Sequence, residues 1–400
     1  MRHALPVLLL LAAAARAGVI EVPGDFASLQ AAVNAALTGD EIVVASGSYE
    51  ETLLIDGKSS ITLRGQGQVI LRGGDAITAT IKLTDCTDVT IERIGFEQSA
   101  SRAVEVEESD GIRLSRCRID GTGGNAVELI NCGGTVIERC VIRQPGGLGI
   151  AVFECSGTLV SQCRIEEAGD SAIRISNLGN TIVERCQLIR PEKFGVEIGV
   201  FVSALGCAVL RNQIVEPGVG GLRLNGAQAI ARENKIVRPG SVGIEVQSGG
   251  GGAILEGNLV IRPGDYGLAI FGANAIVRGN RVVKPGSVGV VADVSGLTLT
   301  DNTFVAPLGS GVDLQSGVSS GFVARNRVLN AVSNGFAIGA SNLLVLENQA
   351  LGCDGDGFLV SNGPNQIAHN AAKGSGQFDL NETSMLSNSF FDNSFPKIAP

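Results

Sequence analysis

The chain has 400 residues, and its 40 acidic residues outnumber its 31 basic residues, which gives a formal net charge of −9 at pH 7. This balance disfavours a general binder of nucleic acid or of anionic membranes, because either partner requires a basic surface. The 55 glycines follow no collagen period and indicate many tight turns. With no tryptophan and two tyrosines, the composition argues against a sugar site built mainly on aromatic stacking.

Residues 1–17 match the pattern of a cleavable signal peptide. Arg2 supplies positive charge, residues 5–15 are apolar, and Ala15-Arg16-Ala17 fits a small-x-small cleavage site. The apolar stretch is too short to cross a bilayer, and no later apolar run is long enough. We therefore expect a secreted, periplasmic or extracellular protein without a membrane span. An uncleaved anchor is the alternative.

The remaining residues, 18–400, are predicted to form a single domain. Within it we expect an N-terminal cap over 18–50, stacked coils over 51–380 and a C-terminal cap over 381–400. The N-terminal cap should contain a helix that begins after Ser28, a residue type that caps helices well, and ends before Gly39. Its apolar residues at helical spacing are Leu29, Ala32, Val33, Ala36 and Leu37.

A short strand pattern recurs along residues 51–380. It reads small, apolar, variable, apolar, so alternation places the apolar side chains inside and the variable one outside. The period varies little, so the turns between strands are short. The pattern begins at Ala103, Ala126, Gly149, Ala172, Gly195, Gly221, Gly243, Gly267, Gly289, Gly311, Gly335, Gly357 and Gln377.

Each unit continues with a second strand, a single ladder position and a third strand that leads into a turn, often through proline. Three short strands with turns between them trace one triangular coil, and only stacking of coils satisfies the strand edges. We therefore predict an all-β fold, a right-handed parallel β-helix with three short parallel sheets and roughly a dozen coils. The ladder position holds Cys117, Cys140, Cys163 and Cys186, followed by Asn212, Asn234, Asn258, Asn280, Asn302, Asn326, Asn348 and Asn370.

The cysteines follow the repeat. Cys117 and Cys140 are separated by one period, as are Cys140 and Cys163. Side chains stacked in register lie about 4.8 Å apart, beyond the Cβ separation of about 3.5–4.5 Å that a disulfide requires. We expect buried free thiols, with disulfides as the alternative in an exported protein.

Three segments near the N-terminus carry a resemblance to a known superfamily. Gly24-Asp-Phe-Ala-Ser-Leu-Gln-Ala-Ala-Val33, Gly39-Asp-Glu-Ile-Val-Val44 and Ile61-Thr-Leu-Arg-Gly65 resemble the cap and first coil of pectate-lyase-like right-handed β-helix proteins. The later coils look like the generic repeats of that superfamily, so the resemblance covers essentially all of residues 18–400. Its members include pectate lyases, polygalacturonases, alginate epimerases and phage tailspikes. The resemblance therefore implies a tendency toward polysaccharides and no particular reaction.

Catalytic signatures of that superfamily that depend on histidine are absent. The chain has two histidines, of which His3 lies in the predicted signal peptide and His369 near the last coils. The remaining chemistry needs carboxylates and arginine, with or without calcium. Glu105, Glu107 and Glu128 are the candidate calcium ligands, because they offer clustered hard oxygens. Arg174, two coils away, is the candidate catalytic residue of a lyase-like reaction.

Outward positions on four successive coils alternate in sign. They are Arg174, Glu197, Arg223 and Glu245. As a substrate site, Glu197, Arg223 and Glu245 would contact a bound sugar chain. The alternative is a surface ladder of charges that neutralise one another.

A second row of charges precedes the corner prolines. Arg238, Arg262 and Lys284 should project from three adjacent coils, which favours an anionic partner. The alternative is a solvated corner that keeps the solenoid soluble. We therefore expect the protein to bind or act on extracellular acidic polysaccharide, lyase-like if catalytic. The alternative is a non-catalytic scaffold, because short turns between coils make a deep cleft hard to form.

Overall fold

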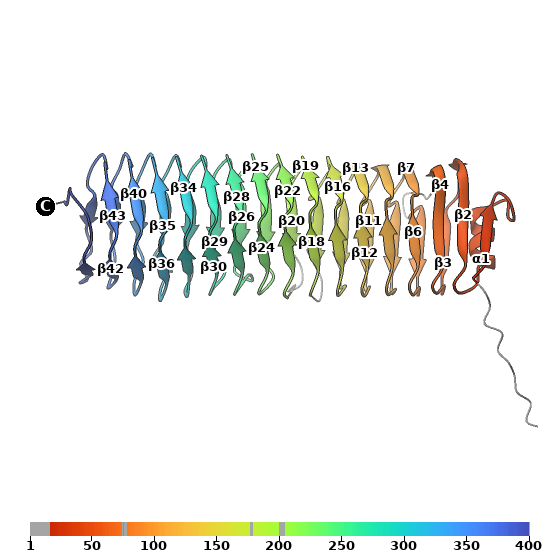
Figure 1. Cartoon of the computed structure of the whole chain (residues 1–400), viewed down its shortest axis with the longest axis horizontal. Helices are drawn as coiled ribbons and strands as arrows, with labels where there is room; N and C mark the ends of the chain where they lie inside the picture. Colours follow the sequence, from red (N-terminus) through yellow and green to blue (C-terminus); the bar gives the residue numbers. More distant parts are fainter. Residues whose placement is uncertain (1–16, 74, 76–77, 177–178, 200–204, 400) are drawn as a thin grey trace, which may run out of the picture.

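The computed structural model describes residues 17–73, 75, 78–176, 179–199 and 205–399. The predicted signal peptide lies outside these residues, apart from Ala17. The described chain forms one elongated stack of coils, with a helix at the N-terminal end (Figure 1). None of the described helices is long and apolar enough to cross a membrane.

The first strand of each coil belongs to a 15-stranded parallel sheet. Fifteen such strands exceed the dozen expected, because the coils begin before the first clear repeat in the sequence. In coil order the strands are β3 (Leu53–Asp56), β5 (Ile81–Thr84), β8 (Val104–Glu107), β11 (Val127–Ile130), β14 (Ile150–Phe153), β17 (Ile173–Ser176), β20 (Phe194–Ile198), β23 (Gly220–Leu224), β26 (Val242–Val246), β29 (Leu268–Ile270), β32 (Val290–Ala292), β35 (Val312–Leu314), β38 (Phe336–Ile338), β41 (Phe358–Val360) and β44 (Leu380–Glu382).

The second and third strands form two ladders of a 30-stranded parallel sheet. The ladders join at β4 (Thr62–Leu71), which pairs with both β6 and β7, and β4 follows β1 (Val19–Val22) and β2 (Glu41–Tyr49). The second strands are β6 (Thr90–Glu92), β9 (Arg113–Ser115), β12 (Val136–Glu138), β15 (Leu159–Ser161), β18 (Ile182–Glu184), β21 (Ala208–Leu210), β24 (Ile230–Arg232), β27 (Ile254–Glu256), β30 (Ile276–Arg278), β33 (Thr298–Thr300), β36 (Phe322–Ala324), β39 (Leu344–Leu346), β42 (Gln366–Ala368) and β45 (Ser389–Phe391). The third strands are β7 (Gly95–Ser99), β10 (Arg118–Thr122), β13 (Val141–Pro145), β16 (Arg164–Glu166), β19 (Gln187–Ile189), β22 (Gln213–Val215), β25 (Lys235–Val237), β28 (Leu259–Ile261), β31 (Arg281–Val283), β34 (Thr303–Val305), β37 (Arg327–Leu329), β40 (Gln349–Leu351) and β43 (Ala371–Lys373).

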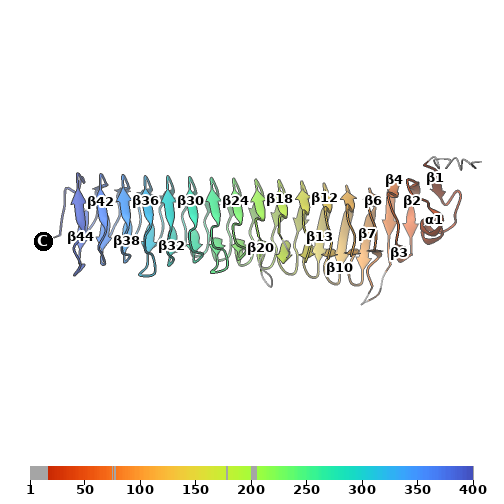
Figure 2. The ribbon, with the colours of Figure 1, turned by 90° about the horizontal axis from the view of Figure 1, so that it is seen from below.

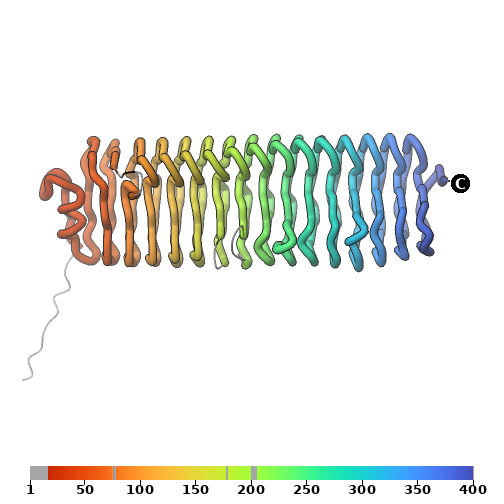
Figure 3. The backbone as a smooth tube through the Cα atoms, turned by 180° about the vertical axis from the view of Figure 1, so that it is seen from behind, coloured from red at the N-terminus to blue at the C-terminus, as the bar shows by residue number. Residues whose placement is uncertain are grey.

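A continuous apolar core fills the interior of the stack. Figures 2 and 3 show the successive coils stacked side by side along the long axis. Each strand buries alternate side chains, as in β35, where Val312 and Leu314 are buried and Asp313 faces out. Aromatic residues enlarge the core in the later coils. The rings of Phe336 and Phe358 stack with centroids 4.6 Å apart.

The cysteine and asparagine ladder lies inside the coils. All nine cysteines are free and buried, which confirms the expected thiols. In the asparagine part, the Asn258 side chain donates to the carbonyl of Ala231 at 2.8 Å and to Asn280 Oδ1 at 2.9 Å. Its own oxygen accepts from the Asn234 backbone N–H at 3.0 Å. Each asparagine therefore satisfies backbone groups of neighbouring coils, which explains a polar residue in this buried position.

The N-terminal helix α1 (Leu29–Ala35) packs against β1, β2 and β3 and covers the first coil. Ser28 is its N-cap, as predicted, and the Ser28 hydroxyl accepts from the Ala31 N–H at 3.2 Å. The Glu51 carboxylate accepts from the Leu29 N–H at 3.2 Å. Leu37 was expected on the buried face but is 65% exposed, because the helix ends two residues earlier.

The last coil differs from the sequence prediction by two residues. The pattern starting at Gln377 placed Asp379 outside, whereas Leu380, not Phe378, pairs with Phe358 and Asp379 is buried. The turn before β44 is longer than the repeat implied, so the register moves. Strand β45 then adds to the stack within 381–400. The Phe395 ring lies 5.2 Å from the Phe358 ring, between centroids, at the open end of the core.

Candidate functional site

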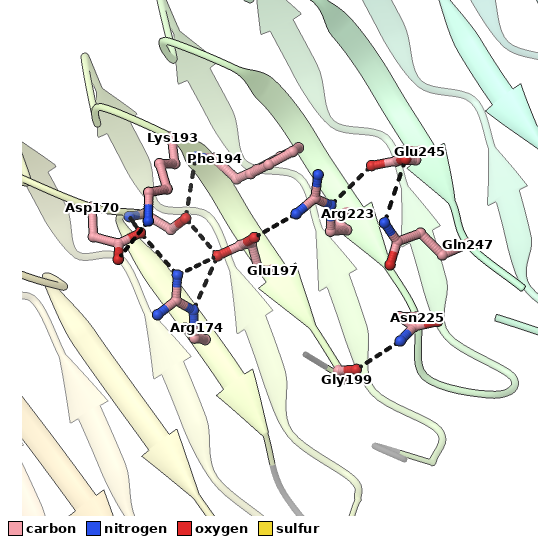
Figure 4. A network of polar contacts seen from close by, with 11 residues as sticks. Asp170, Arg174, Lys193, Phe194, Glu197, Gly199, Arg223, Asn225, Glu245 and Gln247 are labelled. Atoms are coloured by element: carbon pink, nitrogen blue, oxygen red, sulfur yellow. Dashed lines mark hydrogen bonds and ion pairs between the residues drawn. The ribbon is translucent and has the colours of Figure 1, made fainter. Parts of the chain in front are cut away.

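The outer face of the 15-stranded sheet carries a continuous series of ion pairs. Arg174 on β17 pairs in register with Glu197 on β20, followed by Arg223 on β23 and Glu245 on β26. In-register parallel pairing places these side chains about 4.8 Å apart along the stack. Because their signs alternate, each carboxylate meets a guanidinium (Figure 4).

Glu197 is the central and most buried member of this ion-pair chain. Its side chain is 3% exposed and accepts from Arg174 Nη2 at 2.8 Å and from Arg223 Nη1 at 3.2 Å. The Ser171 hydroxyl donates to the same carboxylate at 2.7 Å. A carboxylate so far from water requires partners of this kind, because an unpaired buried charge is strongly destabilising.

Arg174, the predicted catalytic residue, is held between two carboxylates. Its Nη2 atom lies 2.8 Å from Asp170 Oδ1 and 2.8 Å from Glu197 Oε2. Burial raises the pKa of Asp170, but the hydrogen bond from Lys193 and the charge of Arg174 outweigh it, and that pKa lies below its ordinary value. A guanidinium in two ion pairs does not release its proton. The geometry therefore favours a surface series of mutually neutralising charges over a catalytic base at Arg174.

The three candidate calcium ligands share one region of the face with two cations. Lys82 Nζ lies 2.8 Å from Glu105 Oε1 and 2.8 Å from Glu107 Oε2. Arg102 lies 2.9 Å from Glu128 and 3.4 Å from Glu105, between two carboxylates that stack in register.

The hydrogen bonds that Lys82 donates to Glu105 and Glu107 raise the pKa of Lys82, and the bond from Lys82 lowers the pKa of Glu107. Lys82 and Arg102 therefore balance the negative charge of the three carboxylates, as a bound Ca²⁺ would do. Within the described residues, no group of three or more acidic, cysteine or histidine side chains has the geometry of a metal site. Sequence reasoning missed Lys82 and Arg102, although Lys82 precedes Glu105 by one coil at the same strand position.

An apolar hollow of about 190 Å³ lies on the same outer face, beside the ion pairs. We call it the aromatic hollow, and its main residues are Phe194, Arg223, Tyr266 and Phe271. The Arg223 guanidinium lies over the Phe194 ring, 4.1 Å from its centroid, and the Phe271 side chain is 39% exposed. Phe194 and Tyr266 belong to a second apolar cluster that is separate from the interior core. The sequence carried a signal for it, since an aromatic residue precedes the first strand of two nearby coils.

Asp313, on the same face, has apolar residues rather than cations in register with it. Asp313 lies between Val291 and Ala337 on the neighbouring strands. Burial against these apolar neighbours raises the pKa of Asp313, because the charged form loses hydration there. Asp313 is therefore the carboxylate on this face whose environment favours the protonated form, and it lies two coils from Ala269 in the aromatic hollow.

The predicted basic row is exposed, as expected. Arg238, Arg262 and Lys284 follow the residues Val237, Ile261 and Val283, which pair in register on three successive coils.

The three cations are not equivalent. Arg238 donates to Glu216 at 2.9 Å, so its charge is compensated. Arg262 and Lys284 have no ion pair with any described residue. Of the predicted row, these two cations are therefore available to an anionic ligand.

The comparison with protein-family models identifies the chain. The model described as "Right handed beta helix region" matches residues 79–213 and 220–395. The chain belongs to this family. A comparison with curated proteins found no match.

One of three similar solved structures, a phage tailspike, supports the same fold. A tailspike protein of E. coli bacteriophage HK620 aligns with a TM-score of 0.56 at 11% identity, covering 78% of this chain and 72% of that chain. An alginate lyase from Paenibacillus sp. str. FPU-7 aligns at 0.47 and 16% identity, over 75% of this chain and 99% of that one. PfbA, a surface adhesin of Streptococcus pneumoniae, aligns at 0.47 and 10% identity, over 90% and 92%. At such identities the likeness concerns the fold alone.

Proposed function

We propose that this protein binds an acidic polysaccharide outside the cytoplasm, through the aromatic hollow and the cations beside it. The observation that carries the proposal is the second apolar cluster, which lies outside the core on an otherwise charged face. Aromatic rings pack against the apolar faces of sugar rings, while polar groups at the rim bind hydroxyls. Arg223 and Glu245 line the hollow and supply such groups.

The preference for an acidic glycan follows from Arg262 and Lys284. The turn that begins at Arg262 ends at Tyr266, so an exposed cation and an aromatic ring of the hollow lie at the two ends of one turn. Carboxylates and sulfates are the partners that form the strongest hydrogen bonds with such cations. Export, which the pattern of residues 1–17 favours, would bring the protein to glycans of this class.

Binding accounts for the geometry better than cleavage does. Arg174 and Glu197 form an ion pair with each other, so neither is available to transfer a proton to or from a substrate. The hollow, of about 190 Å³, is smaller than ordinary ligand pockets, which are roughly 300–1,000 Å³. A shallow site of this size holds one or two sugar units and leaves the rest of the polymer in solvent.

The test is to measure binding of short oligogalacturonates to the wild type and to Tyr266→Ala by calorimetry, with calcium and with chelator. We expect Kd to rise about tenfold in the variant, the equivalent of about 1.4 kcal/mol. Phe322→Ala is the matched control, because Phe322 is a half-buried aromatic on the outer face of the other sheet. Its Kd should equal that of the wild type.

Two results would contradict this proposal. One is identical affinity in wild type and Tyr266→Ala, which would remove the aromatic hollow from the binding site. The other is the appearance of unsaturated sugar ends in the wild-type mixture, which would make the protein a lyase.

A further inference from the structure

A row of exposed arginines lies at the corner between the second and third strands, away from the 15-stranded sheet. Each arginine directly precedes a ladder position, has its backbone φ between 53° and 56°, and is exposed. We call this set the arginine row. Its members are Arg93, Arg116, Arg139, Arg185 and Arg211, with Gln162 at the equivalent position between Arg139 and Arg185.

The alignment of the row follows from strand register. The residues just before these arginines pair in register from β6 to β21. Successive arginine positions are therefore one coil, or about 4.8 Å, apart, and the row of six positions extends about 24 Å along the stack. An extended polymer that runs parallel to the long axis would meet all of them.

The backbone does not require arginine at this corner. The left-handed conformation favours glycine, and Gly257 and Gly279 occupy the same position in later coils, each with φ of 63°. Glu233 and Glu347 also occupy it, each with φ of 55°. The arginines of the first coils therefore reflect something other than the geometry of the turn.

A hollow of about 530 Å³ adjoins the N-terminal end of the row. Arg93, Arg116 and Arg118 line it, and Gly67 and Gln68 of β4 form part of its wall. Strand β4 departs from regular pairing with β2 where the register shifts, and residues 66–68 are exposed there. The irregular strand thus makes room beside these guanidinium groups. Glu97 and Asp120 also line the hollow, and they are paired with Arg72 and Arg118.

Fewer carboxylates than arginines face the row. Glu92 lies 2.8 Å from Arg116 and 3.3 Å from Arg93, and Glu233 lies 2.6 Å from Arg211. Arg139 donates to the amide oxygen of Gln162 at 3.3 Å, which leaves its charge uncompensated.

Arg185 completes the count, since it has no ion pair with any described residue. Of the carboxylates that precede row positions, Glu138 lies 3.3 Å from Arg113, and the charge of Glu184 acts on Arg211. Arg139 and Arg185 therefore leave unpaired positive charge along this edge, on a protein whose net charge is −9.

We propose that the arginine row and its hollow bind an extended anionic polysaccharide along the solenoid axis, as a second contact surface remote from the aromatic hollow. The class of ligand rests on the proposed function, and the location rests on the arginines. Guanidinium groups bind carboxylates and sulfates through two parallel hydrogen bonds, which suits a polymer with one anionic group per sugar. The row contains no aromatic residue on which bases could stack, so a nucleic acid fits it less well.

The test compares the wild type with Arg116→Glu/Arg139→Glu/Arg185→Glu. Binding of long polygalacturonate is measured over a range of salt concentrations, alongside a DNA strand of equal charge. We expect the triple variant to lose at least tenfold in affinity and to show a weaker salt dependence, because three ion pairs with the polymer are gone. Glutamate occurs naturally at this corner in Glu233 and Glu347, so the variant should fold.

The matched control is Arg281→Glu/Arg327→Glu/Lys373→Glu, which changes the net charge equally on exposed third-strand residues of later coils. Its affinity for polygalacturonate should stay within about threefold of the wild type, since it keeps the row intact. Equal losses in both triple variants would overturn the inference and leave only general electrostatics. Binding of DNA as tight as that of polygalacturonate would overturn the choice of polysaccharide.

The two proposals fail in different ways. If Tyr266→Ala weakens binding of short oligosaccharides while the row variant binds long polymer normally, the arginine row is excluded and the proposed function stands. If the row variant alone loses affinity, the aromatic hollow is excluded and the row stands.

Discussion

Individual charged residues on the 15-stranded sheet illustrate how partners decide the role of a side chain. Glu197 and Asp313 occupy the same outward position on different strands, yet Glu197 receives two guanidinium groups and Asp313 none. Glu197 is therefore held as part of the structure. Asp313 has a raised pKa instead, because burial disfavours its charged form.

Replacing Glu197 tests the structural role of the ion-pair chain. We expect Glu197→Gln to lower the free energy of unfolding by about 3 kcal/mol, because Arg174 and Arg223 lose the buried charge between them. The shift of the denaturant midpoint measures it. Glu233→Gln, which breaks one exposed pair with Arg211, should leave the midpoint unchanged. A loss for Glu197→Gln no larger than for Glu233→Gln would contradict the assignment.

At the scale of strands and turns, the ladder position decides how one coil is joined to the next. In early coils a cysteine fills the site as a small, buried apolar group. In later coils an asparagine fills it and bonds to backbone groups on either side. Both solutions fit the same corner, but the asparagine version depends on complete pairing, since it buries several polar atoms.

Breaking one member of the asparagine ladder should therefore be costly. Asn258→Ala removes the acceptor of the Asn234 N–H and the donor to the Ala231 carbonyl, so we expect a loss of about 3 kcal/mol. Calorimetric unfolding of the variant measures this change. Asn330→Gly is the control, because Asn330 is exposed at a left-handed turn with φ of 54°. Similar losses at both positions would show that turn geometry, not the buried bonds, determines stability.

At the scale of the whole molecule, stability depends on stacking and on covered ends. Every coil contacts its two neighbours, so the terminal coils have an open strand edge and an open core. Helix α1 covers the first coil with Leu29 and Val33 buried, and Phe395 packs on Phe358 near the last. The arginine row and the aromatic hollow are likewise products of stacking, since no single coil contains either.

Removing the helical cover should expose the first coil to other chains. We expect Leu29→Lys/Val33→Lys to self-associate, because both side chains are on the buried face of α1, and without the helix the open edge would pair with another copy. Size-exclusion chromatography with light scattering detects this. Leu37→Lys serves as control, since Leu37 is 65% exposed. A monomeric double variant would show that α1 is not needed to protect the edge.

The repeat period and the alternation of apolar residues were sufficient to predict the β-helix, its ladder and its capping helix. These features depend on local spacing, and every coil carries the same residue pattern. A wrong assignment in one coil therefore does not affect the assignment of the others. Predictions were wrong where the spacing changed, as at Leu37 and in the last coil around Asp379. There a helix end or a longer turn altered the register.

The candidate site depended on contacts that spacing alone does not specify. The sequence determined that Glu105 and Glu128 share a face, but only the folded chain brings Arg102 between them. The aromatic hollow arises in the same way, from side chains of different coils that meet only in the stack. Repetition along the chain determines which residues share a row. Packing between coils decides which of them are paired, buried or free to bind, because those properties depend on neighbours far apart in sequence.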